Sequence, residues 1–184
     1  MHPSKQLITY FEPFMGKAEN ASESFAKSDA YSEWCVSISS LTTWKLPVNF
    51  AQTPQIAKNI KERNWTLKTW LALGEADIDN IHVEHVALNL KHCRPGASDN
   101  QGQSPKFSSI EKSASSAMIN NWETLRSLCT KEQFRFEHAP LVKDSFFAGT
   151  FVCNETYFQM LNLKATDPFF AKTNMCFIHL PSLK

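Results

Sequence analysis

The sequence predicts an α/β fold. Short apolar runs alternate along the chain with longer segments of helical periodicity, and this order is typical of strands and helices packed in layers. Two of the runs, LKTWLALG at 67–74 and NMCFIHLP at 174–181, are apolar enough to be strands of a buried sheet. The 184 residues are 42% apolar and 20% charged, which suffices for one hydrophobic core and predicts a single domain over residues 1–184.

The first half of the chain reads as two strand–helix pairs followed by two more strands. Strands are expected at QLITYF (6–11) and CVSISSLTTWKLPV (35–48), and helices at ASESFAKSDAYSEW (21–34) and PQIAKNIKERN (54–64). The strand LKTWLALG is expected to stop at Gly74, because glycine weakens a strand interior. The alternation in IHVEHVALNL (81–90) predicts another strand.

The second half opens with CRPGASDNQGQSP (93–105), whose Pro, Gly, Asn and Asp content predicts an exposed loop of the kind that often carries function. Helices are expected at NNWETLRSLCTKEQ (120–133) and TFVCNETYFQMLNL (150–163). Strands are expected at APLVKDSFF (139–147) and NMCFIHLP (174–181). No internal repeat interrupts this order.

The charge and hydropathy of the chain exclude several classes of protein. A net charge of +1 provides no basic field for phosphate backbones, so nucleic acid is not an expected partner. The N-terminal MHPSKQ lacks the apolar region of a signal peptide, and no run approaches the roughly 18 apolar residues that cross a bilayer. A cytoplasmic protein without membrane contact is therefore expected.

The cysteines point to reduced thiols, one of which has a reactive setting. The five are widely spaced and form no CxxC pair: Cys35, Cys93, Cys129, Cys153 and Cys176. Cys153 follows Ala148-Gly149 and is expected in the first turn of a helix capped by Thr150, where the helix dipole and free N–H groups favour a thiolate. The alternative is a small buried hydrophobe, as expected for Cys176.

A nucleophilic cysteine needs a base and a group that orients the base, and two residues qualify. His179 ends an apolar strand just before Pro181, although a structural histidine is the alternative there. Glu84 shares a strand face with His82 and must be paired if it is buried, or else exposed on an edge strand.

A metal cluster is a further interpretation of the histidines in this region. Its ligands would be His82, His85, His92 and Cys93, but their spacing matches no standard zinc pattern. No metal is therefore expected.

Several motifs together resemble the pyroglutamyl peptidase I family, also called pyrrolidone-carboxylate peptidases. FEPFMGKAENAS (11–22) resembles the family's FEPFGG…N.S opening. Further matches occur in the family's order: LPV (46–48), LALGEA (71–76), VEHVALN (83–89), AGTFVCN (148–154) and FIHLP (177–181). The resemblance runs from about Ile8 to Pro181, and the order of the motifs makes it specific.

The resemblance implies a three-layer α/β/α sandwich with a mixed, mostly parallel central sheet, of the phosphorylase/hydrolase-like kind. It also implies a cysteine exopeptidase that removes an N-terminal pyroglutamate from peptides and needs no metal or other cofactor. By motif, Cys153 is the nucleophile, His179 the base and Glu84 the residue that orients the imidazole. Relatives often form homodimers or tetramers.

The resemblance also assigns substrate-binding residues. A pyroglutamyl residue is a flat, neutral lactam, so its pocket should combine apolar faces with a few hydrogen bonds. Phe11 and Phe14 would enclose the ring, and Asn20 would hold the loop or the lactam. Arg94, in HCRPG, matches a family arginine near the scissile carbonyl. From the residues alone, both phenylalanines are expected in the core, and an ordinary loop residue is the alternative for Arg94.

Four departures from the family pattern leave two other functions open. Met15-Gly16 replaces a Gly-Gly pair, and Glu75 stands where a neutral residue is usual and could recognise a cationic substrate. The segment 77–84 is one residue short and lacks the family's arginine, and the chain stops at Lys184, where relatives continue into a helix. The alternatives are a cysteine amidohydrolase for another blocked amide and an inactive relative that binds peptides or proteins.

Overall fold

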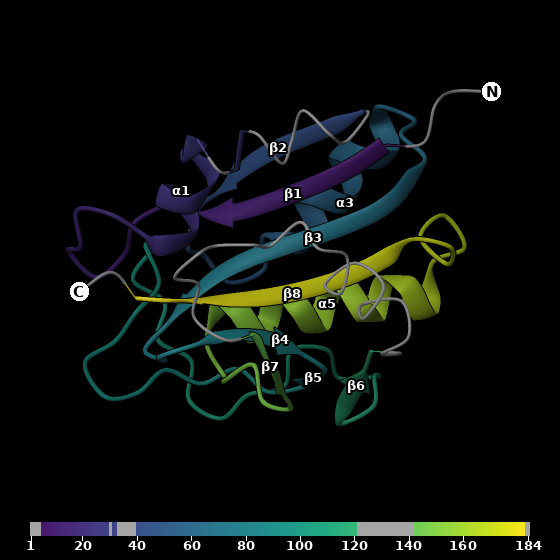
Figure 1. Cartoon of the computed structure of the whole chain (residues 1–184). Coiled ribbons are helices and arrows are strands. Elements are labelled where there is room, and N and C mark those ends of the chain that lie inside the picture. The colour runs from purple at the N-terminus through teal and green to yellow at the C-terminus, as the bar shows by residue number, and fades with distance from the viewer. Residues whose placement is uncertain (1–4, 30, 33–39, 121–141, 183–184) are drawn as a thin grey trace.

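The computed structural model describes residues 5–29, 31–32, 40–120 and 142–182. Its central element is a six-stranded sheet in the order β2-β1-β3-β8-β4-β7 (Figure 1). The strands are β1 (Lys5–Phe11), β2 (Leu41–Leu46), β3 (Leu67–Ala76), β4 (Ile81–Glu84), β7 (Val142–Ser145) and β8 (Asn174–Pro181). All neighbours are parallel except β4 and β8, so the sheet is mixed and mostly parallel, as expected.

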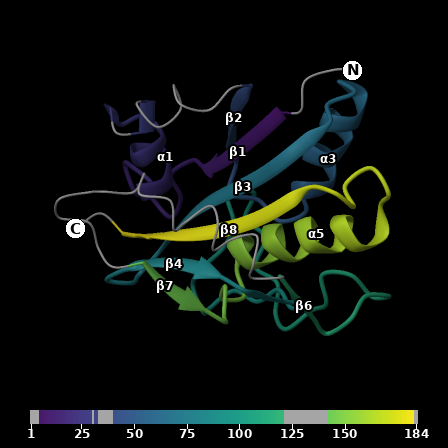
Figure 2. The ribbon, with the colours of Figure 1, turned by 45° about the vertical axis from the view of Figure 1, so that its right-hand side comes forward.

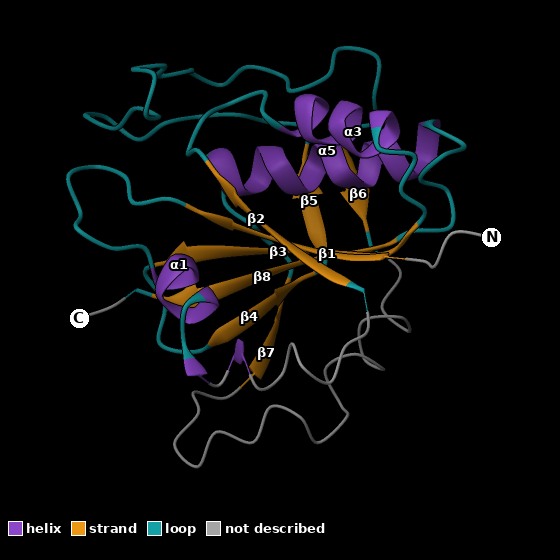
Figure 3. Cartoon of the chain, turned by 90° about the horizontal axis from the view of Figure 1, so that it is seen from above, coloured by secondary structure: helices purple, strands orange, loops and turns teal. Residues whose placement is uncertain are grey.

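Helices cover both faces of this sheet, which gives the three layers (Figure 3). The helices α3 (Thr53–Glu62) and α5 (Val152–Thr166) pack on one face, and α1 (Ala21–Ala26) packs on the other. Figure 2 shows α5 running alongside β8. A small antiparallel sheet of β5 (Val86–Leu88) and β6 (Ala117–Ile119) packs against α5. No helix within the described ranges has the length and apolar character needed to span a bilayer.

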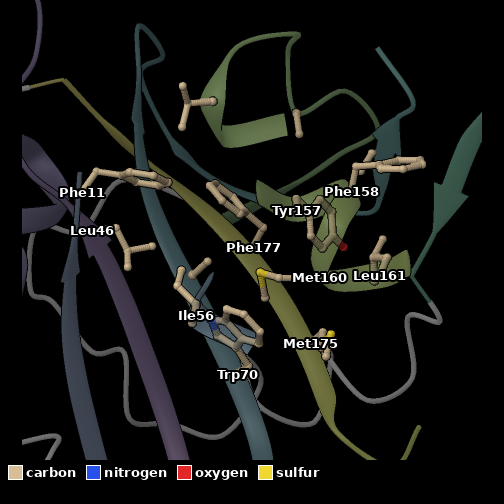
Figure 4. Close-up of a cluster of buried hydrophobic side chains, with 14 of the residues drawn as sticks. Phe11, Leu46, Ile56, Trp70, Tyr157, Phe158, Met160, Leu161, Met175 and Phe177 are labelled. Atoms are coloured by element: carbon tan, nitrogen blue, oxygen red, sulfur yellow. The ribbon is translucent and has the colours of Figure 1, made fainter. Parts of the chain in front are cut away.

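The core lies on both faces of the sheet because the side chains of a strand alternate between its two faces. Along β8, Met175 and Phe177 join the cluster under α3 and α5, whereas Cys176 and Ile178 join the cluster under α1. Figure 4 shows the first cluster, with Trp70 and Phe177 among its rings. This double burial explains why β8 is a continuous apolar run, and it confirms the expected core position of Cys176.

Three expected elements differ from the structure. The helix expected at 21–34 is broken, because α1 ends at Ala26. The strand expected at 81–90 divides at His85, whose N–H donates to Ser145 of the central sheet while its carbonyl accepts from Asn120 beside β6. The third strand was expected to stop at Gly74, but β3 continues to Ala76.

Two other segments complete the comparison with the sequence. Most residues of the loop at 93–105 are exposed, as expected. Asp99 is an exception: it is buried, and its carboxylate accepts from the backbone N–H groups of Phe50, Gln101 and Gln103. The helix expected at 120–133 lies outside the described residues except for Asn120, as do parts of two expected strands, 35–39 and 139–141.

Candidate active site

Cys153 is the second residue of α5 and lies in the first turn, as expected. The expected cap is wrong: the helix begins after Phe151, and the Thr150 hydroxyl instead donates to the His92 carbonyl over 3.1 Å. No side chain caps the helix within the described part of the chain. The first backbone N–H groups of α5 therefore remain available beside the Cys153 sulfur, where they can stabilise negative charge.

Two buried side chains fix the position of this helix terminus against neighbouring strands. The Asn154 amide accepts from the Leu88 N–H over 2.8 Å and donates to the Leu88 and Leu90 carbonyls. One turn later, the Tyr157 hydroxyl donates to the Glu84 carbonyl over 2.7 Å. These bonds hold Cys153 at a set place relative to β4 and β5. Sequence reasoning missed both residues, because their partners are distant in the chain.

His179 and Glu84 meet across the antiparallel pair of β8 and β4. His82 is opposite His179 and Glu84 is opposite Phe177, so the His179 and Glu84 side chains share one face. The imidazole Nδ1–H donates to Glu84 Oε1 over 2.7 Å, and both side chains are buried. Glu84 has therefore found a partner. Its bond to Nδ1 leaves Nε2 as the ring nitrogen that can serve the sulfur.

The pKa values of His179 and Glu84 are both shifted toward their charged forms. Burial disfavours the charged imidazolium, but negative charge on Cys153, a hydrogen bond to its sulfur and the Glu84 carboxylate outweigh burial and raise the pKa of His179 to about 9. Burial likewise opposes the Glu84 carboxylate, but the His179 hydrogen bond and charge hold the pKa of that carboxyl below its usual value. The site thus favours an imidazolium on His179 paired with a carboxylate on Glu84.

Gly74 lies inside β3, and its lack of a side chain leaves room for the Cys153 sulfur. It pairs with His179 across β3 and β8. A Cβ atom at Gly74 would lie 2.9 Å from Cys153 Sγ and 2.9 Å from the Phe177 ring, closer than side-chain contacts allow. The glycine therefore makes room for the helix terminus above the sheet instead of ending the strand.

Cys153 and His179 both line a cavity of about 580 Å³. Four of its lining residues are apolar and define the aromatic chamber: Phe11, Phe14, Val48 and Phe151. Phe11 and Val48 are almost fully buried and also belong to the core, which was the alternative for Phe11. Phe14 and Phe151 stack at 5.9 Å between ring centroids, and Phe50 supports Phe151 edge-on from behind. Phe151 and Val48 lie within the motifs AGTFVCN and LPV, but sequence reasoning gave them no role. A flat, uncharged group is the natural occupant of such a chamber.

Comparison with known proteins agrees with this geometry. The family model for pyroglutamyl peptidases matches residues 4–184. The chain belongs to the pyroglutamyl peptidase family.

The relatives cover most of the chain. The pyrrolidone-carboxylate peptidase of Gloeobacter violaceus is 31% identical over 179 residues, which are 96% of this chain and 81% of that protein. The corresponding peptidase of Bacillus cereus strain ZK / E33L is 29% identical over 180 residues, or 96% of this chain and 78% of that protein. The crystal structure of pyroglutamyl peptidase I from Bacillus amyloliquefaciens superposes with a TM-score of 0.78 at 25% identity, and covers 98% of this chain and 81% of that chain.

Asn20 and Glu75 hold the loop that carries the family's opening motif in place. Asn20 is buried at the N-terminus of α1, where its Oδ1 accepts from the Ser22 N–H and hydroxyl and its Nδ2 donates to the Glu12 carbonyl. Of the two roles considered for Asn20, these contacts favour holding the loop, although the residue also lines the cavity.

Glu75 lines the cavity, but its carboxylate already has partners. It forms an ion pair with Lys17 and accepts from the Ala21 N–H over 2.6 Å and from the Ser182 hydroxyl over 3.0 Å. Burial would raise the pKa of Glu75, but these partners outweigh burial and hold it below its usual value. Because these partners already neutralise the Glu75 carboxylate, the structure does not favour its binding a cationic substrate.

The remaining residues considered from the sequence are spread around the cavity. Arg94 is exposed at its rim. Of the histidines in the metal interpretation, His82 and His92 line the cavity, and His92 also stacks on Phe107 at 3.8 Å between ring centroids. His85 contacts Asp144 instead. The ranges described contain no group of three or more His, Cys, Asp or Glu residues that could hold a metal ion.

Proposed function

We propose that this member of the family hydrolyses the amide bond after an N-terminal pyroglutamyl residue through a thioester on Cys153. The observation that carries the proposal is the buried 2.7 Å bond between Glu84 and His179, with His179 and Cys153 lining the same cavity beside the aromatic chamber. That arrangement supplies an activated nucleophile, a base and an orienting carboxylate in one cavity.

The aromatic chamber fits the pyroglutamyl ring better than it fits an ordinary N-terminal residue. A free α-amino group is charged, and its burial needs a carboxylate or several hydrogen-bond acceptors. Two buried carboxylates line the cavity, and both are already engaged: Glu75 by Lys17 and the start of α1, and Glu84 by His179. Phe11, Phe14 and Phe151 instead offer apolar faces to a neutral lactam.

In the acylation step, the Cys153 thiolate attacks the carbonyl carbon of the scissile amide and a carbon–sulfur bond forms. Negative charge moves to the carbonyl oxygen, which the free N–H groups of the α5 terminus can stabilise, with Arg94 as a further source of positive charge at the rim. The carbon–nitrogen bond then breaks as the His179 imidazolium protonates the departing amine. Glu84 keeps the ring oriented throughout.

In the deacylation step, water replaces the amine on the same side of the thioester. Neutral His179 accepts a proton from this water as its oxygen bonds to the carbonyl carbon. The carbon–sulfur bond breaks, free pyroglutamate leaves, and the thiolate and imidazolium are restored. His179 therefore acts first as an acid and then as a base.

Replacement of the nucleophile tests this proposal. Cys153→Ala should keep the fold and lower kcat/KM for a fluorogenic pyroglutamyl arylamide by about 10⁴-fold or more. Cys176→Ala, which alters a buried core thiol, is the matched control and should retain turnover. Near-normal turnover by Cys153→Ala would refute the assignment.

Two further measurements separate the alternative functions. Ordinary aminoacyl and other blocked arylamides should be poor substrates, and a preference for one of them would favour an amidohydrolase of different specificity. In an inactive relative, Cys153 would react with iodoacetamide no faster than the other thiols.

A further inference from the structure

The cavity continues past the nucleophile, away from the aromatic chamber. Phe11 ends β1, Phe14 lies in the loop after β1, and Val48 lies just after β2, at one end of the strand order. On the other side of Cys153, the lining comes from His82 on β4 and from Phe147, two residues after the end of the edge strand β7. One five-membered lactam occupies only the chamber side of this cavity.

The chemistry of the proposed function determines which part of a substrate enters the second side. His179 must protonate the departing amine, so that amine faces the imidazole. His179 lies on β8, between β3, whose Gly74 supports the sulfur, and β4, which carries His82. The residue after the pyroglutamate therefore extends past His179 toward β4 and Phe147.

Phe147 is an exposed ring at this place. Its exposed fraction is 59%, although large apolar side chains usually gain free energy when they are covered. Ile78, which is partly buried, lines the same cavity. A substrate side chain that covers these two residues would remove apolar surface from water on both sides of the contact.

Resting on the proposed function, we propose that Phe147 forms an apolar subsite for the side chain that follows the pyroglutamyl residue. Peptides with a large apolar or aromatic side chain at that position are the preferred substrates. The neighbouring Phe146 has a different environment, since its ring stacks on His85 at 5.1 Å between centroids. It is 69% exposed, so it provides a matched control of the same residue type, neighbouring position and similar exposure.

The test compares kcat/KM for pyroglutamyl-phenylalanine amide with kcat/KM for pyroglutamyl-alanine amide. The wild-type ratio should be about tenfold in favour of phenylalanine, the size expected for partial burial of one ring. Phe147→Ala should reduce this ratio to near one, Phe147→Leu should retain most of it, and Phe146→Ala should leave it unchanged. Elution volume on a sizing column should be the same for all variants.

Each remaining outcome overturns a different statement. If the wild type cleaves neither amide, the proposed function fails. If it cleaves both with a ratio near one, or if Phe147→Ala keeps the wild-type ratio, the function stands and the subsite is wrong. If Phe147→Ala changes the elution volume and loses both activities equally, Phe147 belongs to a contact between copies of the chain.

Discussion

At the scale of single residues, the reactivity of the site depends on a carboxylate that is buried only because it has a partner. Glu84 is 1% exposed, and an unpaired charge at that depth would be strongly destabilising. Its charge raises the pKa of His179, together with the charge on Cys153 and against the effect of burial. The same bond fixes which ring nitrogen faces the sulfur.

Glu84→Gln should therefore lower kcat/KM for a pyroglutamyl arylamide by about 10²–10⁴-fold, because the neutral amide orients the ring poorly and stabilises the imidazolium less. Loss of the negative charge lowers the pKa of His179 from about 9, so the alkaline limb of the pH–rate profile should move to lower pH. The measurement is kcat/KM from pH 6 to 10. A lower plateau with an unmoved alkaline limb would contradict this role.

At the scale of elements, the substrate pocket depends on one loop, 12–20, that joins β1 to α1. Phe14 lies in this loop, and Glu75 at the end of β3 ties the loop through Lys17 and ties α1 through the Ala21 N–H. Ser182, directly after β8, donates to the same carboxylate. One carboxylate thus connects the pocket loop with the ends of two central strands.

Glu75→Gln should raise KM for a pyroglutamyl amide by about fivefold and change kcat less, because loss of about 1 kcal/mol in holding the loop weakens the chamber without touching the reacting groups. Glu23→Gln is the matched control, since Glu23 on α1 pairs with Lys27 and Lys45 and should not alter KM. If Glu75 instead binds a cationic group of the substrate, the wild type will prefer a cationic blocked amide and Glu75→Gln will lose that preference.

The sequence predicted the elements of this fold better than it predicted their boundaries. The segment that became α3 has clear helical periodicity and the one that became β8 is a continuous apolar run, so local pattern was sufficient there. Gly74 was misread, because the reason for a glycine is the sulfur of a residue far along the chain. His85 was misread as strand interior for the same reason, since its hydrogen bonds reach Ser145 and Asn120.

The site residues likewise divide into those that local sequence signals indicate and those whose partners are distant in the chain. The thiol at a helix start and the histidine at a strand end are local signals, and Cys153 and His179 could be proposed from them. The partnership of Glu84 with His179 spans 95 positions and depends on the antiparallel register of β4 and β8, which no local pattern contains. For the same reason, the roles of Asn154 and Tyr157 became visible only in the folded chain.

At the scale of the whole molecule, α5 carries an internal acid as well as the nucleophile. Glu155 is 1% exposed, and its Oε1 accepts from the Ala51 N–H over 2.9 Å. Its Oε2 has no hydrogen-bond partner in the ranges described. Burial raises the pKa of Glu155 to about 7, against the opposing effects of the Ala51 N–H and of Lys91. The charged form of this carboxyl therefore weakens the packing of α5 against the segment that leads into α3.

This acid should make global stability depend on pH. Because the native pKa of Glu155 is raised from 4.5 to about 7, the native state binds the proton more tightly, and stability falls as pH rises between these values. Glu155→Gln does not lose stability in this way. Its free energy of unfolding should be similar to that of the wild type at pH 4.5 and higher at pH 8, by up to about 3 kcal/mol. Urea unfolding of both proteins at the two pH values measures the difference, in which other titrating groups cancel. A difference that is the same at both pH values would show that folding leaves the pKa of Glu155 unchanged.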